Sequence, residues 1–370
     1  MMDGRVSMNM LLLYVCMLVV MPSSIPAFTV YWNVPTQTCL KFGVHINVSV
    51  FGIVQNSNDL FYGDKVNIFY KPGLFPTLTA DGRVAVNGGI PQNGSLISHT
   101  QAFTKRVQKL LPDNYSGIAV LDFEDYYPSL AMNQPEYLNA SYSWVASAHP
   151  DWPHSRVVEE AERTFNHTAR EFFEVLLWLG RELRPQAMWG YYHYPYCHDY
   201  QPGNPHCKPQ VMEHNNACVW LIRGSTALYP SIYISEHSGW SARARRLMTL
   251  GRLGEAIRMR HRALATYTPI LPYFWYRYHD TTQFLSGVDV VNTLGLVRVL
   301  GLEGAVVWGG SKDMSTWTQC NQLKMYAEEK LGPLVKYLTD IPITSLPRLL
   351  RSRRRLQSIV TSVLSQPSSP

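Results

Sequence analysis

Short apolar runs alternate with amphipathic stretches through most of the chain. The apolar runs predict strands at residues 29–32, 66–70, 118–123, 188–192, 231–234, 270–275 and 305–308. Apolar positions spaced three and four apart predict helices at residues 157–176, 242–265 and 288–299. Because strands alternate with helices, we expect the α/β class, with a parallel sheet covered by helices. A body of this length suits one closed barrel better than two small domains.

The two ends of the chain differ from this body. Residues 1–27 combine Arg5 with an apolar core and small residues before Phe28, which is the pattern of a secretory signal peptide with a core too short to span a bilayer comfortably. Residues 341–370 are basic, without any acidic residue, and end in Ser and Pro. A basic surface helix and a processing site are alternatives for this tail, but its few apolar residues favour a disordered extension. We therefore expect a single domain at residues 28–340.

The net charge indicates what kind of partner to expect, and the glycosylation sequons indicate the cellular compartment. Five arginines of the tail supply most of the formal net charge of +6, so the body is nearly neutral and its overall charge gives no reason to expect a nucleic acid partner. We expect a secreted, extracellular protein without a membrane span. Glycosylation sequons support this compartment. They lie at Asn47, Asn93, Asn114, Asn139 and Asn166.

The cysteines of the body are odd in number. They are Cys39, Cys197, Cys207, Cys218 and Cys320. An odd number leaves at least one thiol unpaired in an oxidising compartment unless chains are joined. Histidines near Cys197 and Cys207 raise the alternative of a zinc site, but the spacing fits no standard ligand pattern and secretion favours a disulfide. We expect neither a metal nor another cofactor.

The most informative chemistry follows the predicted strand at residues 118–123. Residues 118–121 are apolar on both faces, as in a buried parallel strand, and functional groups gather at the carboxyl ends of such strands. Asp122 and Glu124 are two residues apart, so both point to one face while Phe123 packs on the other. Two like charges this close raise the pKa of one carboxyl, which keeps it protonated beside an ionised partner. A solvated loop or a helix N-cap is the alternative, and the position at a strand end favours catalysis.

Aromatic residues end most of the predicted strands. They include Tyr70, Tyr192, Tyr233 and Trp308. One such residue would be an ordinary core or rim aromatic, but the repetition at the same end of successive strands is harder to explain in that way. Aromatic planes stack on sugar faces, and Tyr hydroxyls bond glycan oxygens. The pattern predicts a groove for an extended carbohydrate.

Motifs across residues 28–340 resemble the hyaluronidases of the animal and insect-venom type. In the family's order they are FTVYWNVP at 28–35, IFYKPGLFP at 68–76, NGGIPQ at 87–92, DFE at 122–124, WGYY at 189–192, YPYC at 194–197, YPSIY at 229–233, LPYFWY at 271–276 and VWG at 307–309. The resemblance implies a distorted TIM-like (β/α) barrel. It also implies a secreted endo-β-N-acetylglucosaminidase that hydrolyses β-1,4 bonds of hyaluronan, and often of chondroitin. We expect a monomer whose partner is hyaluronan or a related glycosaminoglycan.

The resemblance also implies roles for single residues. Catalysis in the family is substrate-assisted, because the acetamido oxygen of the sugar attacks the anomeric carbon and the protein supplies no nucleophile. Glu124 matches the general acid and base, and Asp122 matches the carboxylate that orients the acetamido group. The matched substrate-binding residues are Tyr70, Tyr192, Tyr233 and Trp308. The matched disulfides are Cys39 with Cys320 and Cys197 with Cys207, which leaves Cys218 unmatched.

One stretch departs from the family pattern. After the catalytic Glu the family usually reads a small residue and then Trp-Arg-Pro, whereas this chain has Asp125, Tyr126, Tyr127 and Pro128. A groove that lacks the arginine and gains an acid would attract a glucuronate polymer less strongly. The alternative function is therefore a non-hydrolytic or weakly active homologue that binds glycan.

Overall fold

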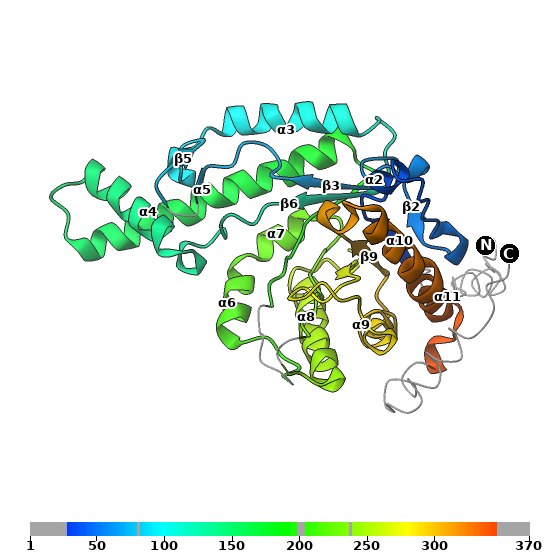
Figure 1. The fold of residues 1–370 in the computed structure, drawn as a ribbon. Coiled ribbons are helices and arrows are strands. Elements are labelled where there is room, and N and C mark those ends of the chain that lie inside the picture. The colour runs from blue at the N-terminus through cyan, green and yellow to red at the C-terminus, as the bar shows by residue number, and fades with distance from the viewer. Residues whose placement is uncertain (1–27, 80–81, 198–203, 237–238, 346–370) are drawn as a thin grey trace, which may run out of the picture.

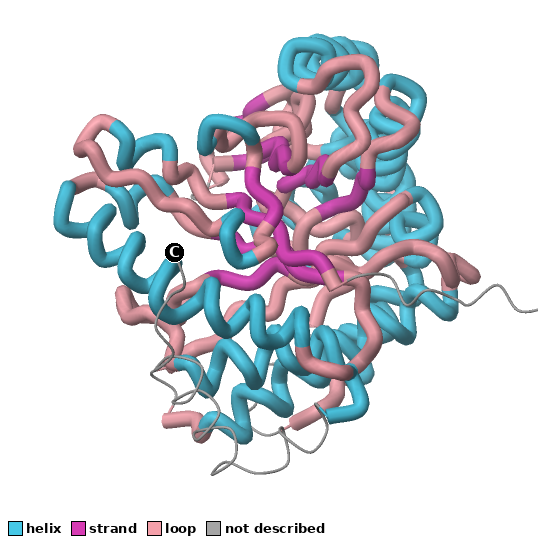
Figure 2. The backbone as a smooth tube through the Cα atoms, turned by 90° about the vertical axis from the view of Figure 1, so that its right-hand side faces the viewer, coloured by secondary structure: helices cyan, strands magenta, loops and turns pink. Residues whose placement is uncertain are grey.

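A computed structural model describes residues 28–79, 82–197, 204–236 and 239–345. Parallel strands form the centre of the molecule, and helices surround them (Figure 1, Figure 2). The predicted signal peptide and residues 346–370 of the predicted tail lie outside the described residues. None of the helices in the described part of the chain has the length and apolar character needed to cross a membrane.

The strands form two parallel sheets and one small hairpin. Their bounds are β1 Thr29–Asn33, β2 Val54–Gln55, β3 Val66–Tyr70, β4 Thr77–Leu78, β5 Ala85–Val86, β6 Ile118–Asp122, β7 Met188–Tyr191, β8 Tyr273–Trp275 and β9 Gly304–Trp308. One sheet has the order β2-β1-β9-β8 and the other the order β3-β6-β7, while β4 and β5 pair antiparallel. Parallel bridges from Tyr192 to Tyr229 and from Ser231 to Tyr273 connect β7 to β8, and β1 contacts β3. The parallel strands therefore curve around one common centre.

One predicted strand is wrong. Residues 231–234 form no strand and contribute only the single bridge at Ser231. Pro230 precedes this bridge, and a proline lacks the N–H that a continuous ladder needs. Its carbonyl accepts a hydrogen bond from the Tyr273 amide at 2.8 Å, so the segment still holds its place between β7 and β8.

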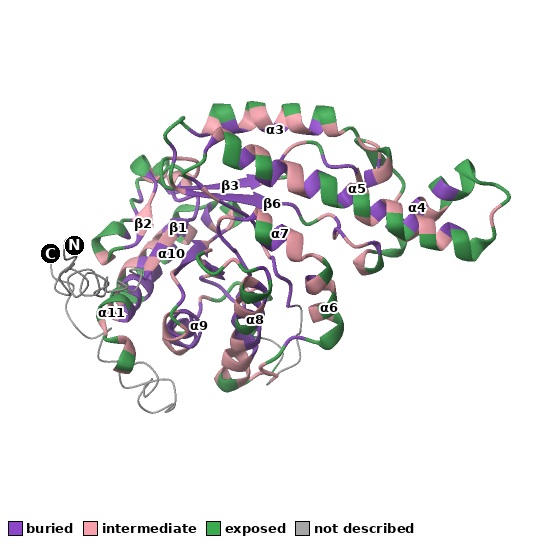
Figure 3. Cartoon of the chain, turned by 180° about the vertical axis from the view of Figure 1, so that it is seen from behind, coloured by how far each residue is buried: buried purple, intermediate pink, exposed green. Residues whose placement is uncertain are grey.

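Helices cover the outside of the strands. Their bounds are α2 Gln37–Leu40, α3 Leu96–Leu110, α4 Pro135–Ala148, α5 His154–Leu183, α6 Pro209–Ala217, α7 Val219–Gly224, α8 Ala242–Arg262, α9 Gly287–Val299, α10 Trp317–Tyr326 and α11 Gly332–Asp340. The predicted helices correspond to α5, α8 and α9. α5 buries one apolar side against the strands, as its spacing predicts, whereas its outer face is exposed (Figure 3).

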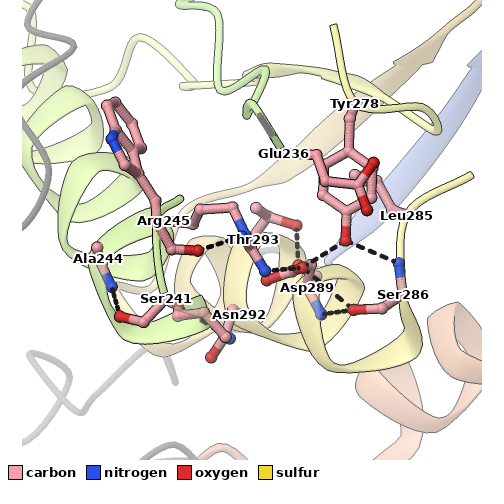
Figure 4. A network of polar contacts seen from close by, with 12 residues as sticks. Glu236, Ser241, Ala244, Arg245, Tyr278, Leu285, Ser286, Asp289, Asn292 and Thr293 are labelled. Carbon is pink, nitrogen blue, oxygen red and sulfur yellow. Dashed lines mark hydrogen bonds and ion pairs between the residues drawn. The ribbon is translucent and has the colours of Figure 1, made fainter. Parts of the chain in front are cut away.

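A buried ion pair joins α8 to α9 (Figure 4). The Arg245 guanidinium lies 2.8 Å from Oδ2 of Asp289, whose side chain is 0% exposed. The hydroxyls of Tyr278 and Ser286 donate to the same oxygen at 2.6 and 3.1 Å. Three groups, one from α8 and two from the segment between α8 and α9, thus meet at the Asp289 carboxylate.

We expect Asp289→Ala to destabilise the fold by about 3–5 kcal/mol, because it leaves the Arg245 cation, which is only 13% exposed, without its carboxylate. Urea unfolding measures this loss. Asp340→Ala is the matched control, since it breaks the exposed Lys336–Asp340 pair, which is 3.0 Å long and contributes at most about 1 kcal/mol. Equal losses in the two variants would contradict the assigned importance of the buried pair.

Candidate active site

Strand β6 presents the two carboxylates. Its residues are all buried, and it pairs in parallel with β3 and β7. Phe123 turns away from the carboxylates and stacks on Phe75, with 3.8 Å between the ring centroids. Asp122 and Glu124 point the other way and share a side-chain hydrogen bond. The predicted alternation at this strand end is confirmed.

Burial separates the two carboxylates electrostatically. Asp122 is 9% exposed as a whole residue, whereas the side chain of Glu124 is 53% exposed. Burial, followed by the adjacent Glu124 carboxylate, raises the pKa of Asp122 to about 8. The pair therefore retains one proton near neutral pH.

An aromatic cavity of about 410 Å³ opens in front of the pair. It brings together the four predicted substrate-binding residues, namely Tyr70, Tyr192, Tyr233 and Trp308. The Trp308 indole donates to the Tyr70 hydroxyl at 2.8 Å, and the Tyr233 and Trp308 rings stack with centroids 5.9 Å apart. Tyr273 and Trp275 of β8 complete the aromatic lining.

Sequence reasoning did not identify several residues near the site, among them His193 and Arg252. His193 places its Nδ1 atom 3.5 Å from Oε2 of Glu124, and burial lowers its pKa. Arg252, buried in α8, donates to the carbonyl oxygen of Tyr233 at 2.7 Å. The position of His193 directly after Tyr192 was a usable signal, whereas nothing in the spacing of α8 identifies Arg252.

The stretch that departs from the family pattern lies mostly behind the cavity. Tyr126 is buried in the aromatic core, 4.8 Å from Phe123 between ring centroids, and Tyr127 packs against Tyr196 at 4.7 Å. Neither tyrosine lines the cavity, whereas Asp125 does. The Tyr126–Tyr127 pair therefore contributes no side chain to the lining of this cavity.

Both implied disulfides are present. Cys39 of α2 is bonded to Cys320 of α10, and Cys197 is bonded to Cys207. Cys218 is a free thiol between α6 and α7. The first bridge joins two segments with a sequence separation of 281, and the second closes a short loop that begins beside Tyr196.

Four sequon asparagines are accessible. Asn47, Asn93, Asn114 and Asn139 are exposed. Asn166 lies inside α5, is partly buried and accepts a hydrogen bond from the Leu130 amide at 2.7 Å. The four exposed side chains are therefore the better candidates for glycosylation.

Comparisons with known proteins agree with this fold. The family model described as hyaluronidase matches residues 20–343. The chain is 37% identical to the hyaluronidase of Apis mellifera over 84% of each chain, and 37% identical to hyaluronidase A of Vespula vulgaris over 85% of this chain and 97% of the wasp protein. The crystal structure of bee venom hyaluronidase in complex with hyaluronic acid tetramer matches with a TM-score of 0.79 and 36% identity, covering 84% of this chain and 99% of that one. This likeness confirms the predicted TIM-like barrel. The chain therefore belongs to the hyaluronidase family of glycoside hydrolases.

Proposed function

We propose that this protein is a secreted endo-β-N-acetylglucosaminidase that cleaves the β-1,4 bonds of hyaluronan. The observation that carries the proposal is the Asp122–Glu124 pair, which retains a proton at the floor of an aromatic cavity. Relatives named hyaluronidase, and a related structure with a bound hyaluronic acid tetramer, support the choice of substrate. We expect a monomer whose exposed sequons carry glycans.

The aromatic lining supplies binding and orientation. Trp308 and Tyr233 offer stacked planes to the sugar, and the hydroxyls of Tyr70 and Tyr192 lie where they can bond its oxygens. The Trp308–Tyr70 hydrogen bond and the Arg252 contact to the Tyr233 carbonyl hold these side chains in place before substrate arrives. Such preorganisation lets binding energy align the scissile bond.

The two carboxylates divide the chemistry. The pair shares one proton through its hydrogen bond. Glu124, the more exposed carboxyl, passes this proton to the leaving glycosidic oxygen while the acetamido oxygen of the N-acetylglucosamine attacks C1, so that one C–O bond forms as the other breaks. Once the shared proton has left, Asp122 is ionised, and its carboxylate stabilises the positive charge that develops on the acetamido nitrogen. Glu124 then takes a proton from a water molecule as the water oxygen attacks C1. The bond between C1 and the acetamido oxygen breaks in this step, so the product leaves with its configuration retained.

The direct test is to incubate purified protein with hyaluronan and to size the products. We expect short, even-numbered oligosaccharides with N-acetylglucosamine at the reducing end. A parallel incubation with chondroitin measures how far the site also accepts the galactosamine epimer. Intact hyaluronan after incubation with folded protein would contradict the proposal.

We expect Asp122→Asn to reduce turnover about 100-fold by misplacing the acetamido group, and at the same time to stabilise the protein above pH 8. The wild-type carboxyl titrates at about 8 rather than at its usual 3.8, so the folded state binds the proton more tightly than the unfolded chain does. The free energy of unfolding of the wild type must then fall as pH rises between these two values. Thermal unfolding of both proteins across this range tests the claim. A variant with the same pH profile as the wild type would show that the raised pKa belongs elsewhere.

A further inference from the structure

A second cavity adjoins the first. It has a volume of about 320 Å³ and lies between the segment after β3 and the β4–β5 hairpin. Thr77, Leu78 and Asn87 are among the residues that line it. The two cavities share Lys71 and Asp125, so they meet at these two side chains. A glycan longer than the first cavity can therefore run past both side chains into the second.

Lys71 brings a positive charge to a groove whose other described lining residues are acidic or uncharged. Among the described residues that line the two cavities it is the single cation, whereas the acids are Asp122, Glu124 and Asp125. Its Nζ atom lies 3.3 Å from Oδ1 of Asp125, and the two side chains are 77% and 27% exposed. An ion pair this open to solvent contributes little to stability, so one partner can exchange without a large loss.

The backbone fixes where Lys71 begins. Its φ angle of +47° lies in the left-handed region, which non-glycine residues seldom occupy outside functional or tightly constrained positions. Its amide donates to the carbonyl oxygen of Asp122 at 2.8 Å. Gly73 shortly after it has φ +69°, and a Cβ atom there would meet the His99 ring at 2.7 Å. The lysine is thus tied to the same strand end as the carboxylate pair.

We propose that Lys71 determines charge specificity by binding the carboxylate of an acidic sugar, and that Asp125 is its exchangeable counter-ion in the free enzyme. This inference rests on the proposed function and extends it to the choice among glycans. When a uronate reaches the junction of the cavities, its carboxylate replaces Asp125 at the ammonium group. Asp125 then competes with the substrate and repels it, so this acid lowers the affinity for anionic chains.

The test measures binding of two probes, a hyaluronan hexasaccharide and the uncharged N-acetylglucosamine hexamer. Glu124→Gln serves as the parent, so that no probe is cleaved during titration. At low salt, Lys71→Met should weaken hyaluronan binding about fivefold and Asp125→Asn should strengthen it by a similar factor, as an exposed ion pair allows. Both factors should vanish near 1 M salt, where the Debye length is about 3 Å. Binding of the uncharged hexamer should change in neither variant.

Lys336→Met is the matched control, because Lys336 forms an exposed pair with Asp340 on α11. This substitution should leave both affinities unchanged. The inference is overturned if Lys71→Met binds hyaluronan as the parent does, or loses the uncharged hexamer equally. Wild-type turnover is measured separately. If the wild type leaves hyaluronan intact, the proposed function fails; if it cleaves hyaluronan and Lys71→Met binds normally, only this inference fails.

Discussion

Glu124→Gln should abolish hydrolysis of hyaluronan while leaving the fold and glycan binding largely unchanged. The amide nearly matches the carboxyl in shape, but its N–H groups are far too weakly acidic to protonate the leaving oxygen. General acid–base catalysis contributes typically 10²–10⁴-fold, and we expect a loss of at least about that size. The new amide can still form a hydrogen bond with the buried Asp122, so the change should not leave this carboxyl without a partner. Turnover of hyaluronan by folded variant and wild type, at equal concentration, measures the loss.

Glu182→Gln provides the control for this variant. Glu182 is an exposed residue near the end of α5 and lines neither cavity. The turnover of the Glu182→Gln variant should therefore equal that of the wild type. If Glu124→Gln kept most of the activity, Glu124 would not be the general acid, and the carboxylate pair would not have its proposed role.

The bridge between Cys39 and Cys320 should be the larger of the two disulfide contributions to stability. It closes a loop with a sequence separation of 281, whereas Cys197 and Cys207 are separated by 10. The chain-entropy relation gives roughly 5 kcal/mol for the long loop and about 3 kcal/mol for the short one. The physical reason is that the long bridge removes more freedom from the unfolded chain.

Paired Cys→Ser variants test this order. Cys39→Ser with Cys320→Ser removes the long bridge, and Cys197→Ser with Cys207→Ser removes the short one, each with the other bridge intact. Denaturant unfolding without reductant compares them. If the short bridge contributed as much as the long one, native-state effects rather than loop length would control the difference.

The sequence predicts the parts of the fold that are built from strong local patterns. The run at residues 118–121 and the wide apolar stripe of α5 each correspond to an observed element, because burial on both faces and a helical period leave clear marks. α4 and α10 were missed because their apolar residues are sparse or irregular, although Thr316 and Gln319 form a capping box at the start of α10. Residues 231–234 were predicted as a strand from their apolar content alone. That prediction failed because it did not take into account that Pro230, just before them, has no N–H to donate.

The site was predictable where it depends on strand ends. Tyr70, Asp122, Tyr192 and Trp308 all lie at the ends of parallel strands, and parallel strands bring such residues to one face. Residues held by distant contacts were not predictable in this way. Asn133 binds both the amide and the carbonyl of Tyr127, at 2.7 and 2.9 Å, and so keeps that segment in a position that no linear pattern reveals. The Arg252 contact to the Tyr233 carbonyl is of the same kind.

The central claim is that this carboxylate pair cleaves hyaluronan with the acetamido group of the substrate as nucleophile. Proton NMR of the first product, recorded before the anomers equilibrate, tests it most directly. Substrate assistance predicts N-acetylglucosamine at the new reducing end with the β configuration of the original linkage retained. An initial α anomer, or a different sugar at the reducing end, would contradict the account.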